Sequence, residues 1–471
     1  MGKDRHPTLM LLRTALLLTA VACLIESSSD LWAQEAVSTT TMTTGSGATS
    51  SASATESSSN ATNAPGATSG SGETVVETAP SGPAAFSRTP VQIYATISGG
   101  YDTNVNTTTN AQKQSSGFTN ANAILDYTFG DPRLQLTLNT GAGGTYYYEH
   151  VSGQSYDIDF KGALGITYKS SPRLTIGSTI LAEYLTEPSF EYAGGLNSRN
   201  GNYLYTVDKF FANYAWSRRF STQTSYTFDA YNYDDDAVGL SSNRITNTFG
   251  NEFRLQLVPT TVLVVEYRYS IVSYEHEGEI VIPAVFIGPF QIAPAVRLQD
   301  DSTTHFAVAG IDHIFNPRLS CSLRGGAEFR SYDADGDRNG PYFEGTVTYA
   351  IGRRTSLSWN SRYGLEEPDT PTEQSRTTFR TGLQAKIPLA PRIASTVDLY
   401  YVHDEFHALV NGPSVSTPFS ENTFDGGITL RYNVTPLFGM QVGYHYSDVS
   451  SGMATQEYTR SRVFAGANVT F

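Results

Sequence analysis

The final stretch of the chain, residues 458–471, alternates strictly between apolar and polar positions. The apolar positions hold Val463, Ala465, Ala467, Val469 and Phe471. The polar positions hold Arg462, Gly466, Asn468 and Thr470, with Phe464 as the one large exception. A period of two indicates a β-strand with one apolar and one wet face. An amphipathic strand at the end of a soluble sheet has the same pattern, so the rest of the chain must distinguish the two.

A short turn recurs along the chain from residue 131 onward. The middle residues of its eight copies are Pro132, Pro172, Arg218, Pro259, Pro317, Arg353, Pro391 and Pro436. Proline fixes φ for a tight turn and cannot lie within a central ladder, so these turns separate strands. Nine longer polar loops alternate with them, near residues 101–118, 149–155, 186–203, 233–243, 275–301, 333–341, 366–375, 407–422 and 448–457. Eight turns and nine loops join eighteen strands, or sixteen if the outermost hairpins are misread.

Short turns at one end and long loops at the other are typical of outer-membrane β-barrels, whose short turns face the periplasm. Only 39% of the residues are hydrophobic, and after the N-terminus no apolar run is long enough for a transmembrane helix. In a barrel only alternate residues meet lipid, and the 12% aromatic content suits two interfacial girdles. A β-propeller would need four short strands per interval, whereas each interval here holds two long ones. The sequence therefore predicts an all-β, transmembrane, antiparallel up-and-down β-barrel.

The N-terminal part differs in composition from the rest. Residues 1–33 have a basic start, a short apolar core and Leu31-Trp32-Ala33 as a cleavage site, as in a secretory signal peptide. A lipoprotein site ending at Cys23 is the competing interpretation. Residues 34–88 are rich in Ser, Thr, Ala, Gly and Pro, which predicts a disordered periplasmic tether. The barrel is then expected over 89–471, where Cys321 has no second cysteine for a disulfide.

Two short motifs carry a family resemblance. Gly100-Tyr101-Asp102-Thr103-Asn104-Val105 follows the first expected strand, and the chain ends in Asn468-Val469-Thr470-Phe471. Together they resemble the β-barrel porin type 2 family of bacterial outer-membrane proteins, although that family usually has an acidic residue where Thr103 stands. The resemblance implies a barrel in the outer membrane of a diderm, Gram-negative-type bacterium. It also implies that Phe471 belongs to the signal read by the barrel-assembly machinery.

Assigning the apolar positions to lipid places many charged side chains inside the barrel. The expected pore-lining residues are Arg254, Arg268, Arg324, Glu328, Arg330, Arg362, Arg376, Arg380, Lys386, Arg431 and Arg462. Ionised groups there require a wet lumen or mutual pairing. A basic-leaning wall would favour anionic solutes, or saccharides held by arginine donors. The alternative is a self-neutralising ladder of arginine and glutamate that selects nothing.

The loop over 275–301 is unusually apolar for a surface segment, with Ile280, Phe286 and Phe290 among its large side chains. Such a loop is expected to be buried against something. One hypothesis is a constriction folded into the lumen, and the alternatives are a β-hairpin extending the wall or a protein-contact tip. The acidic loops, such as Asp333–Asn339, predict a solvated rim bridged by divalent ions to lipopolysaccharide.

No sequence pattern indicates an enzyme, a cofactor or a metal site. His403 and His407 lie four residues apart in an expected strand, too far apart for one ion. The formal net charge of -14 argues against nucleic acid. The expected function is an outer-membrane porin-like channel for passive diffusion of small hydrophilic solutes, anionic or saccharide ones included. The alternative is the barrel of a polysaccharide export or surface-assembly system, with a periplasmic partner bound through the tether.

Overall fold

The computed structural model describes residues 91–151, 154–186, 201–276, 280–282, 285–287, 290–293, 296–297, 300–333, 336–351, 355–368, 373–408 and 418–471. Eighteen antiparallel strands form one closed sheet in these residues. The first nine are β1 (Val91–Asp102), β2 (Ser116–Gly130), β3 (Leu134–Val151), β4 (Gln154–Lys169), β5 (Leu174–Leu185), β6 (Tyr203–Ala215), β7 (Phe220–Tyr233), β8 (Arg244–Val258) and β9 (Thr261–Tyr274). The others are β14 (Ser302–Asn316), β15 (Leu319–Tyr332), β16 (Asp337–Ile351), β17 (Thr355–Glu366), β18 (Glu373–Ala390), β19 (Ile393–Ala408), β20 (Ser420–Asn433), β21 (Phe438–Ser451) and β22 (Tyr458–Thr470).

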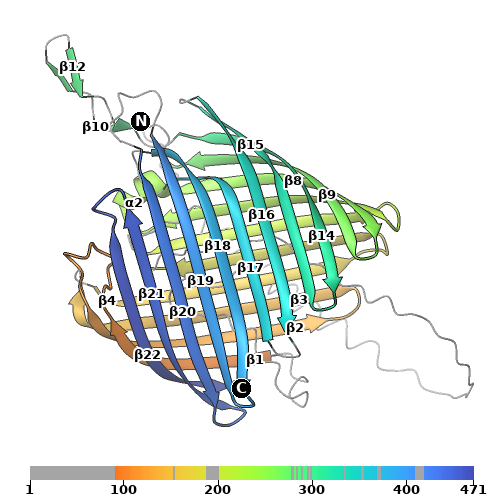
Figure 1. The fold of residues 1–471 in the computed structure, drawn as a ribbon, viewed down its shortest axis with the longest axis horizontal. Coiled ribbons are helices and arrows are strands. Elements are labelled where there is room, and N and C mark those ends of the chain that lie inside the picture. The colour runs from red at the N-terminus through yellow and green to blue at the C-terminus, as the bar shows by residue number, and fades with distance from the viewer. Residues whose placement is uncertain are drawn as a thin grey trace, which may run out of the picture. The chain divides into compact units, whose positions relative to one another are not determined.

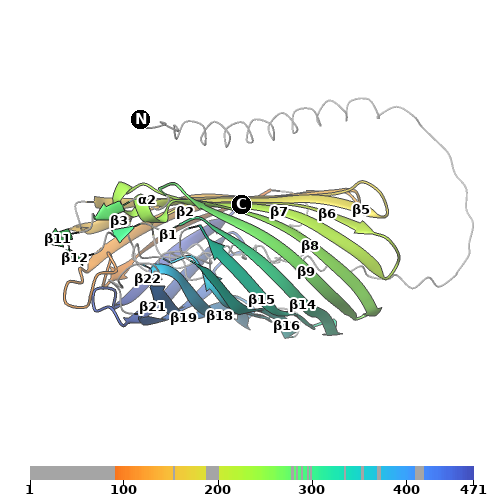
Figure 2. The ribbon, with the colours of Figure 1, turned by 90° about the horizontal axis from the view of Figure 1, so that it is seen from above.

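Each wall strand pairs with its neighbours in chain order, and β1 pairs with both β2 and β22. In Figure 1, β15 to β22 cross in front of β2 to β9, and Figure 2 shows these two groups as opposite walls. The closing ladder runs in register from Tyr94 opposite Thr470 to Asp102 opposite Arg462. At the end of the chain the backbones of Ile93 and Phe471 exchange two hydrogen bonds. The eighteen-strand prediction is therefore confirmed, and the closed sheet leaves no edge exposed.

Five of the seven described short turns share a chemical device that the proline pattern alone did not reveal. Their first residue is Asp131, Ser171, Ser217, Asn316 or Thr435, whose side-chain oxygen accepts backbone N–H groups two or three residues on. Asp131 Oδ1 accepts from Arg133 at 2.6 Å and from Leu134 at 2.7 Å. Ser171, Ser217 and Thr435 each accept two such bonds in the same way. These five turns therefore provide their own acceptor, whereas the described turns that begin at Val258 and Ala390 have no side-chain oxygen at that position.

Among the described turns, Asp131 is the one acceptor of this kind that titrates. Because its carboxylate accepts the N–H groups of Leu134 and Arg133, its pKa lies below the ordinary value. The turn expected at residues 352–354 lies outside the described residues, as do the expected signal peptide, Cys23 and the tether.

The opposite end of the barrel carries the long connections. It includes α2 (Asp236–Ser242) and four short strands, β10 (Ile280–Ile282), β11 (Val285–Ile287), β12 (Phe290–Ala293) and β13 (Val296–Arg297). β10 pairs with β13 and β11 with β12, so the apolar segment forms a two-level hairpin. Both views draw this hairpin beyond the ends of the wall strands, on the side of α2 (Figures 1 and 2). No helix in the described part of the chain is long and apolar enough to cross a membrane.

The outward positions of the wall are apolar and solvent-accessible. Val463 is 50% exposed and Phe471 70%, whereas Arg462 and Asn468 on the opposite face of β22 are buried. Exposed aromatic side chains gather near both ends of the strands: Phe129, Tyr168, Trp216, Phe315 and Tyr432 at the short turns, and Tyr101, Tyr146, Tyr148 and Tyr156 at the long loops. An apolar band between two aromatic girdles matches the lipid-facing surface of a transmembrane barrel.

Phe464 breaks the alternation of β22 because it faces inward onto a glycine. It lies opposite Gly443 on β21, where an added Cβ would come within 2.1 Å of the Phe464 ring. The ring also packs with Phe118, Tyr147 and Val105. The glycine therefore provides the space that a large inward side chain needs.

Candidate functional site: the inner wall of the barrel

The concave face of the sheet can be identified from contacts between strands that are not neighbours. Arg254 on β8 reaches Asp312 on β14, although β9 lies between them. Arg268 on β9 reaches Glu344 on β16 across both β14 and β15. Side chains can skip strands in this way only on the inside of a curved wall. The charged residues of these strands therefore line the inside of the barrel, opposite the exposed apolar face.

The half of the inner wall nearer the short turns holds one charge cluster. Arg254 Nη1 lies 2.5 Å from Glu252 Oε1, and its Nη2 lies 2.7 Å from Asp312 Oδ2. Arg324 Nη1 on β15 lies 2.8 Å from the other oxygen of Asp312. Two guanidinium groups thus share two carboxylates, which is a nearly neutral arrangement.

A second cluster lies further along the same strands. Arg268 Nε is 2.7 Å from Glu266 Oε1, and Nη2 is 2.9 Å from Glu344 Oε1. The Tyr342 hydroxyl donates to Glu344 at 2.5 Å, and the Arg362 guanidinium lies 5.7 Å from the centre of the Tyr342 ring. Arginine again meets carboxylate and aromatic partners rather than open solvent.

The third cluster lies at the long-loop end of the barrel, and Glu367 is its central group. Glu367 follows β17, yet it accepts a hydrogen bond from Arg330 on β15 at 2.7 Å and from the Tyr274 hydroxyl on β9 at 2.8 Å. Three wall strands, β14, β15 and β16, lie between β9 and β17. Arg330 also donates to Thr304 and to the carbonyl of Leu365. This network therefore connects β9 to the end of β17 across the inside of the curved wall.

Arginines of β18 extend the cluster further around the barrel. Arg376 is fully buried and lies 3.7 Å from Glu366 and 3.5 Å from Asp404. Arg380 lies 3.2 Å from Glu366. Burial of these charged side chains shows that the inner wall is most crowded near the long loops.

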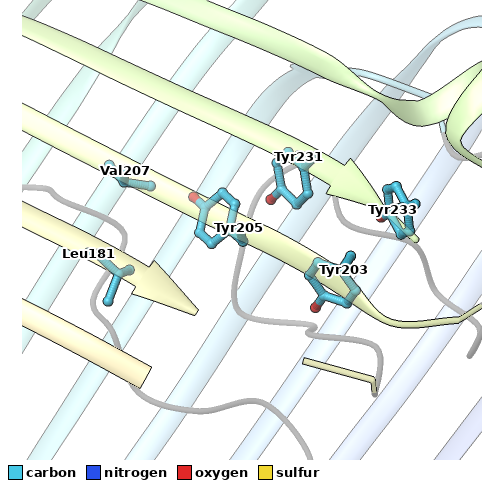
Figure 3. Packing of buried hydrophobic residues seen from close by; sticks show 6 residues of the cluster. All are labelled: Leu181, Tyr203, Tyr205, Val207, Tyr231 and Tyr233. Carbon is cyan, nitrogen blue, oxygen red and sulfur yellow. The ribbon is translucent and has the colours of Figure 1, made fainter. Parts of the chain in front are cut away.

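Four buried tyrosines lie near the long-loop ends of β6 and β7. Tyr203, Tyr205, Tyr231 and Tyr233 pack with one another, with ring centres 4.5 to 6.3 Å apart in the contacting pairs (Figure 3). The guanidinium of Arg244 on β8 lies 4.3 Å above the Tyr231 ring. Aromatic packing with a cation over one face stabilises this part of the wall.

The seam between the first and last strands has its own buried ion group. Asp102 at the end of β1 is completely buried and contacts Arg460 at 2.5 Å and Arg462 at 3.2 Å. Its Oδ1 also accepts the backbone N–H of Asn104 at 2.9 Å. The Asn104 side chain in turn donates to the Thr459 carbonyl of the last strand at 3.2 Å. The Gly100–Val105 motif thus ties the first strand to the last.

The structure places the predicted pore-lining residues on the inner face, but it changes their electrostatic character. Most of the arginines lie against carboxylates, several of which the sequence analysis did not assign to the site: Asp102, Asp312, Glu344, Glu366, Glu367 and Asp404. Glu328 instead accepts the backbone N–H of Leu365. Pairs of this kind are what the self-neutralising ladder predicts. Lys386 and Arg431 lie apart from the three clusters.

Other sequence hypotheses have simpler outcomes. The backbone around Ile280, Phe286 and Phe290 is the hairpin beyond the wall strands, and the side chains of these residues lie outside the described part. His403 bonds Asn422 at 2.8 Å, and His407 bonds Thr377 at 2.7 Å. Within the described residues, no group of three or more His, Cys, Asp or Glu side chains is placed to hold a metal ion.

Comparison with known proteins gives similarity to solved structures only. No protein-family model matches the chain, and no curated protein matches it. The chain is similar to Acinetobacter baumannii OccAB4 (11% identity, TM-score 0.39), with 81% of this chain and 99% of that chain covered. It is likewise similar to Pseudomonas aeruginosa OpdK, solved with vanillate (10% identity, TM-score 0.39; 81% and 99% covered). The siderophore receptor PirA of A. baumannii matches at 8% identity and a TM-score of 0.40, with 81% of each chain covered.

Proposed function

We propose that this chain is an outer-membrane channel of a diderm bacterium, through which small hydrophilic solutes diffuse passively and without catalysis. The observation that carries the proposal is the division of the closed wall into two faces. Its outer face is an exposed apolar band with aromatic girdles, and its inner face holds ionised side chains. Eighteen strands enclose an interior wider than side chains from the wall alone can fill.

We further propose that the narrowest part lies at the long-loop end, around Glu367. There the inward side chains are buried, and the Tyr274–Glu367–Arg330 contacts cross the inner wall. Passage would then be limited by size at this level. The paired charges of the wall would leave the ion selectivity weak, because a guanidinium beside a carboxylate presents little net field to a passing ion.

The constriction predicted for Ile280, Phe286 and Phe290 is a separate proposal. Deletion of residues 280–296 would raise the single-channel conductance if this hairpin narrows the path. An unchanged conductance would instead leave the Glu367 level as the limiting element.

Membership of the β-barrel porin type 2 family is also proposed. The motif of residues 100–105 has a physical role that supports it, because Asp102 and Asn104 join the first strand to the last. By the same resemblance, Phe471 serves the barrel-assembly machinery. The acidic composition of the long loops, in turn, is the basis for the proposal that they contact lipopolysaccharide through divalent ions. The alternative export function relied on the tether, residues 34–88, which lies outside the described residues. The channel proposal is tested by liposome swelling, in which folded protein should admit small sugars faster than larger ones. Equal exclusion of all solutes would contradict it.

A further inference from the structure

One part of the inner wall differs from the charge clusters. It is a hollow in the half of the barrel nearer the short turns, spanning β19 to β22, β1 and β2. The hollow holds about 700 Å³, counted with the open solvent inside it. It is lined by Tyr94, Thr96, Asn122, Ile124, Ala394, Thr396, Thr429, Arg431, Gln441 and Phe464.

The floor of the hollow is aromatic and its rim is polar. Tyr94 and Phe464 are buried, whereas the polar lining residues are partly accessible. Among the described residues of the lining, Arg431 is the only charged one, and its guanidinium lies 5.8 Å from the centre of the Tyr94 ring. The adjacent carboxylate of Asp126 points to Asn139 and is not part of the lining. Asp398, two residues from Thr396, is likewise outside it.

The polar rim is available for a ligand. Among the described residues, no hydrogen bond engages the side chains of Thr96, Asn122, Thr396, Thr429 and Gln441. Elsewhere on the inner wall, arginines and carboxylates largely satisfy one another. Two amides and three hydroxyls offer both donors and acceptors, within reach of the guanidinium donors of Arg431.

We propose that this hollow is a binding subsite for uncharged, hydroxyl-rich solutes. Sugar hydroxyls match a rim of mixed donors and acceptors, and the apolar face of a sugar ring matches the aromatic floor. One cation with two nearby carboxylates outside the lining gives an anion little advantage. The biological meaning of the site rests on the proposed channel function. A solute in a channel must bind weakly enough to leave, so the dissociation constant is expected on the order of 1 mM.

The experiment measures glucose binding to the full chain folded in detergent micelles, by calorimetric titration. The variants are Gln441→Ala on β21 and Asn122→Ala on β2, and each is expected to weaken binding about fivefold, as for one lost hydrogen bond. The matched control is Gln223→Ala on β7. Gln223 is also an inward amide, and like Gln441 it is the fourth residue of its strand, but on the distant wall. Heat-modifiable electrophoretic mobility verifies that each variant is folded.

The expected result is glucose binding that both hollow variants weaken and the control leaves unchanged. Absence of glucose binding by the folded wild type, or equal binding in all four proteins, would overturn the subsite. Glucuronate binding more than tenfold tighter than glucose would overturn its uncharged ligand class. Because the titration needs no ion flow, a protein that binds glucose but conducts no current would refute the channel and leave the subsite standing.

Discussion

Neutralising Asp102 should weaken the barrel at its seam more than any loop substitution of the same kind. Asp102→Asn keeps the volume of the side chain but removes the charge that faces Arg460 at 2.5 Å and Arg462 at 3.2 Å. Both arginines are nearly fully buried, so two cations would lose their shared anion in a place that water does not reach. Removing one partner of a buried ion group costs about 3–5 kcal/mol. The amide oxygen can still accept the N–H of Asn104, but the amide nitrogen then replaces Oδ2, the oxygen that accepts from Arg460 and faces Arg462, so both the charge and these hydrogen bonds are lost.

The assay is urea unfolding of the purified protein in lipid or detergent, followed by tryptophan fluorescence and by the heat-modifiable gel band. Glu457→Gln is the control, because Glu457 is an exposed carboxylate in the loop just before β22. The control should change the free energy of unfolding by less than about 0.5 kcal/mol. If the free energy of unfolding of Asp102→Asn differs from that of the wild type by no more than this margin, the seam does not depend on this ion group and the reasoning is refuted.

Three further changes test other parts of the structure. Glu367→Ala removes the carboxylate that Arg330 contacts at 2.7 Å, which should cost about 3 kcal/mol of stability and shift the bilayer reversal potential toward anion preference. Gly443→Ala places a Cβ within 2.1 Å of the Phe464 ring and should destabilise by about 1–3 kcal/mol in thermal unfolding. Asp131→Ser should make the free energy of unfolding depend less on pH in the acid range. The pKa of Asp131 is lowered in the folded protein, so its carboxylate stabilises the turn above about pH 3.9. This contribution is lost as the pH falls through the folded pKa.

Each of these changes has a matched comparison. Gly99→Ala is the control for the glycine, since an added Cβ there would meet nothing closer than 3.5 Å. Glu457→Ala is the control for Glu367→Ala and should leave the reversal potential unchanged. Ser171 already provides a neutral acceptor in its own turn, so Ser171→Ala should change stability equally at pH 3 and pH 7. A Glu367 variant with unchanged selectivity, or a Gly443 variant as stable as wild type, would contradict the packing described.

The strand number and the facing of side chains could be predicted because both depend on local pattern. Period-two alternation places Arg254 and Arg324 inside without knowledge of their neighbours. The turns could be counted from proline and arginine, although the acceptor at Asp131 shows that the first residue of the turn matters as much. These features need only a few consecutive residues.

The partners of the inner charges could not be predicted, because they come from distant strands. Arg268 meets Glu344 across two intervening strands, and no local spacing encodes that contact. Glu367 belongs to a loop, and only the fold brings it to Tyr274. The carboxylate of Asp102 stood inside the motif that carried the family resemblance, but its contact with the last strand depends on barrel closure. Contacts of this kind therefore become visible only in the folded barrel.

The most direct test of the channel is planar-bilayer conductance of the folded full chain, with the reversal potential measured under a salt gradient. Long-lived open steps with a reversal potential near zero are predicted, because the inner arginines lie beside carboxylates. Heat-modifiable mobility of the same sample must show that the barrel is closed. Folded protein that inserts into the bilayer and passes no current would contradict the account.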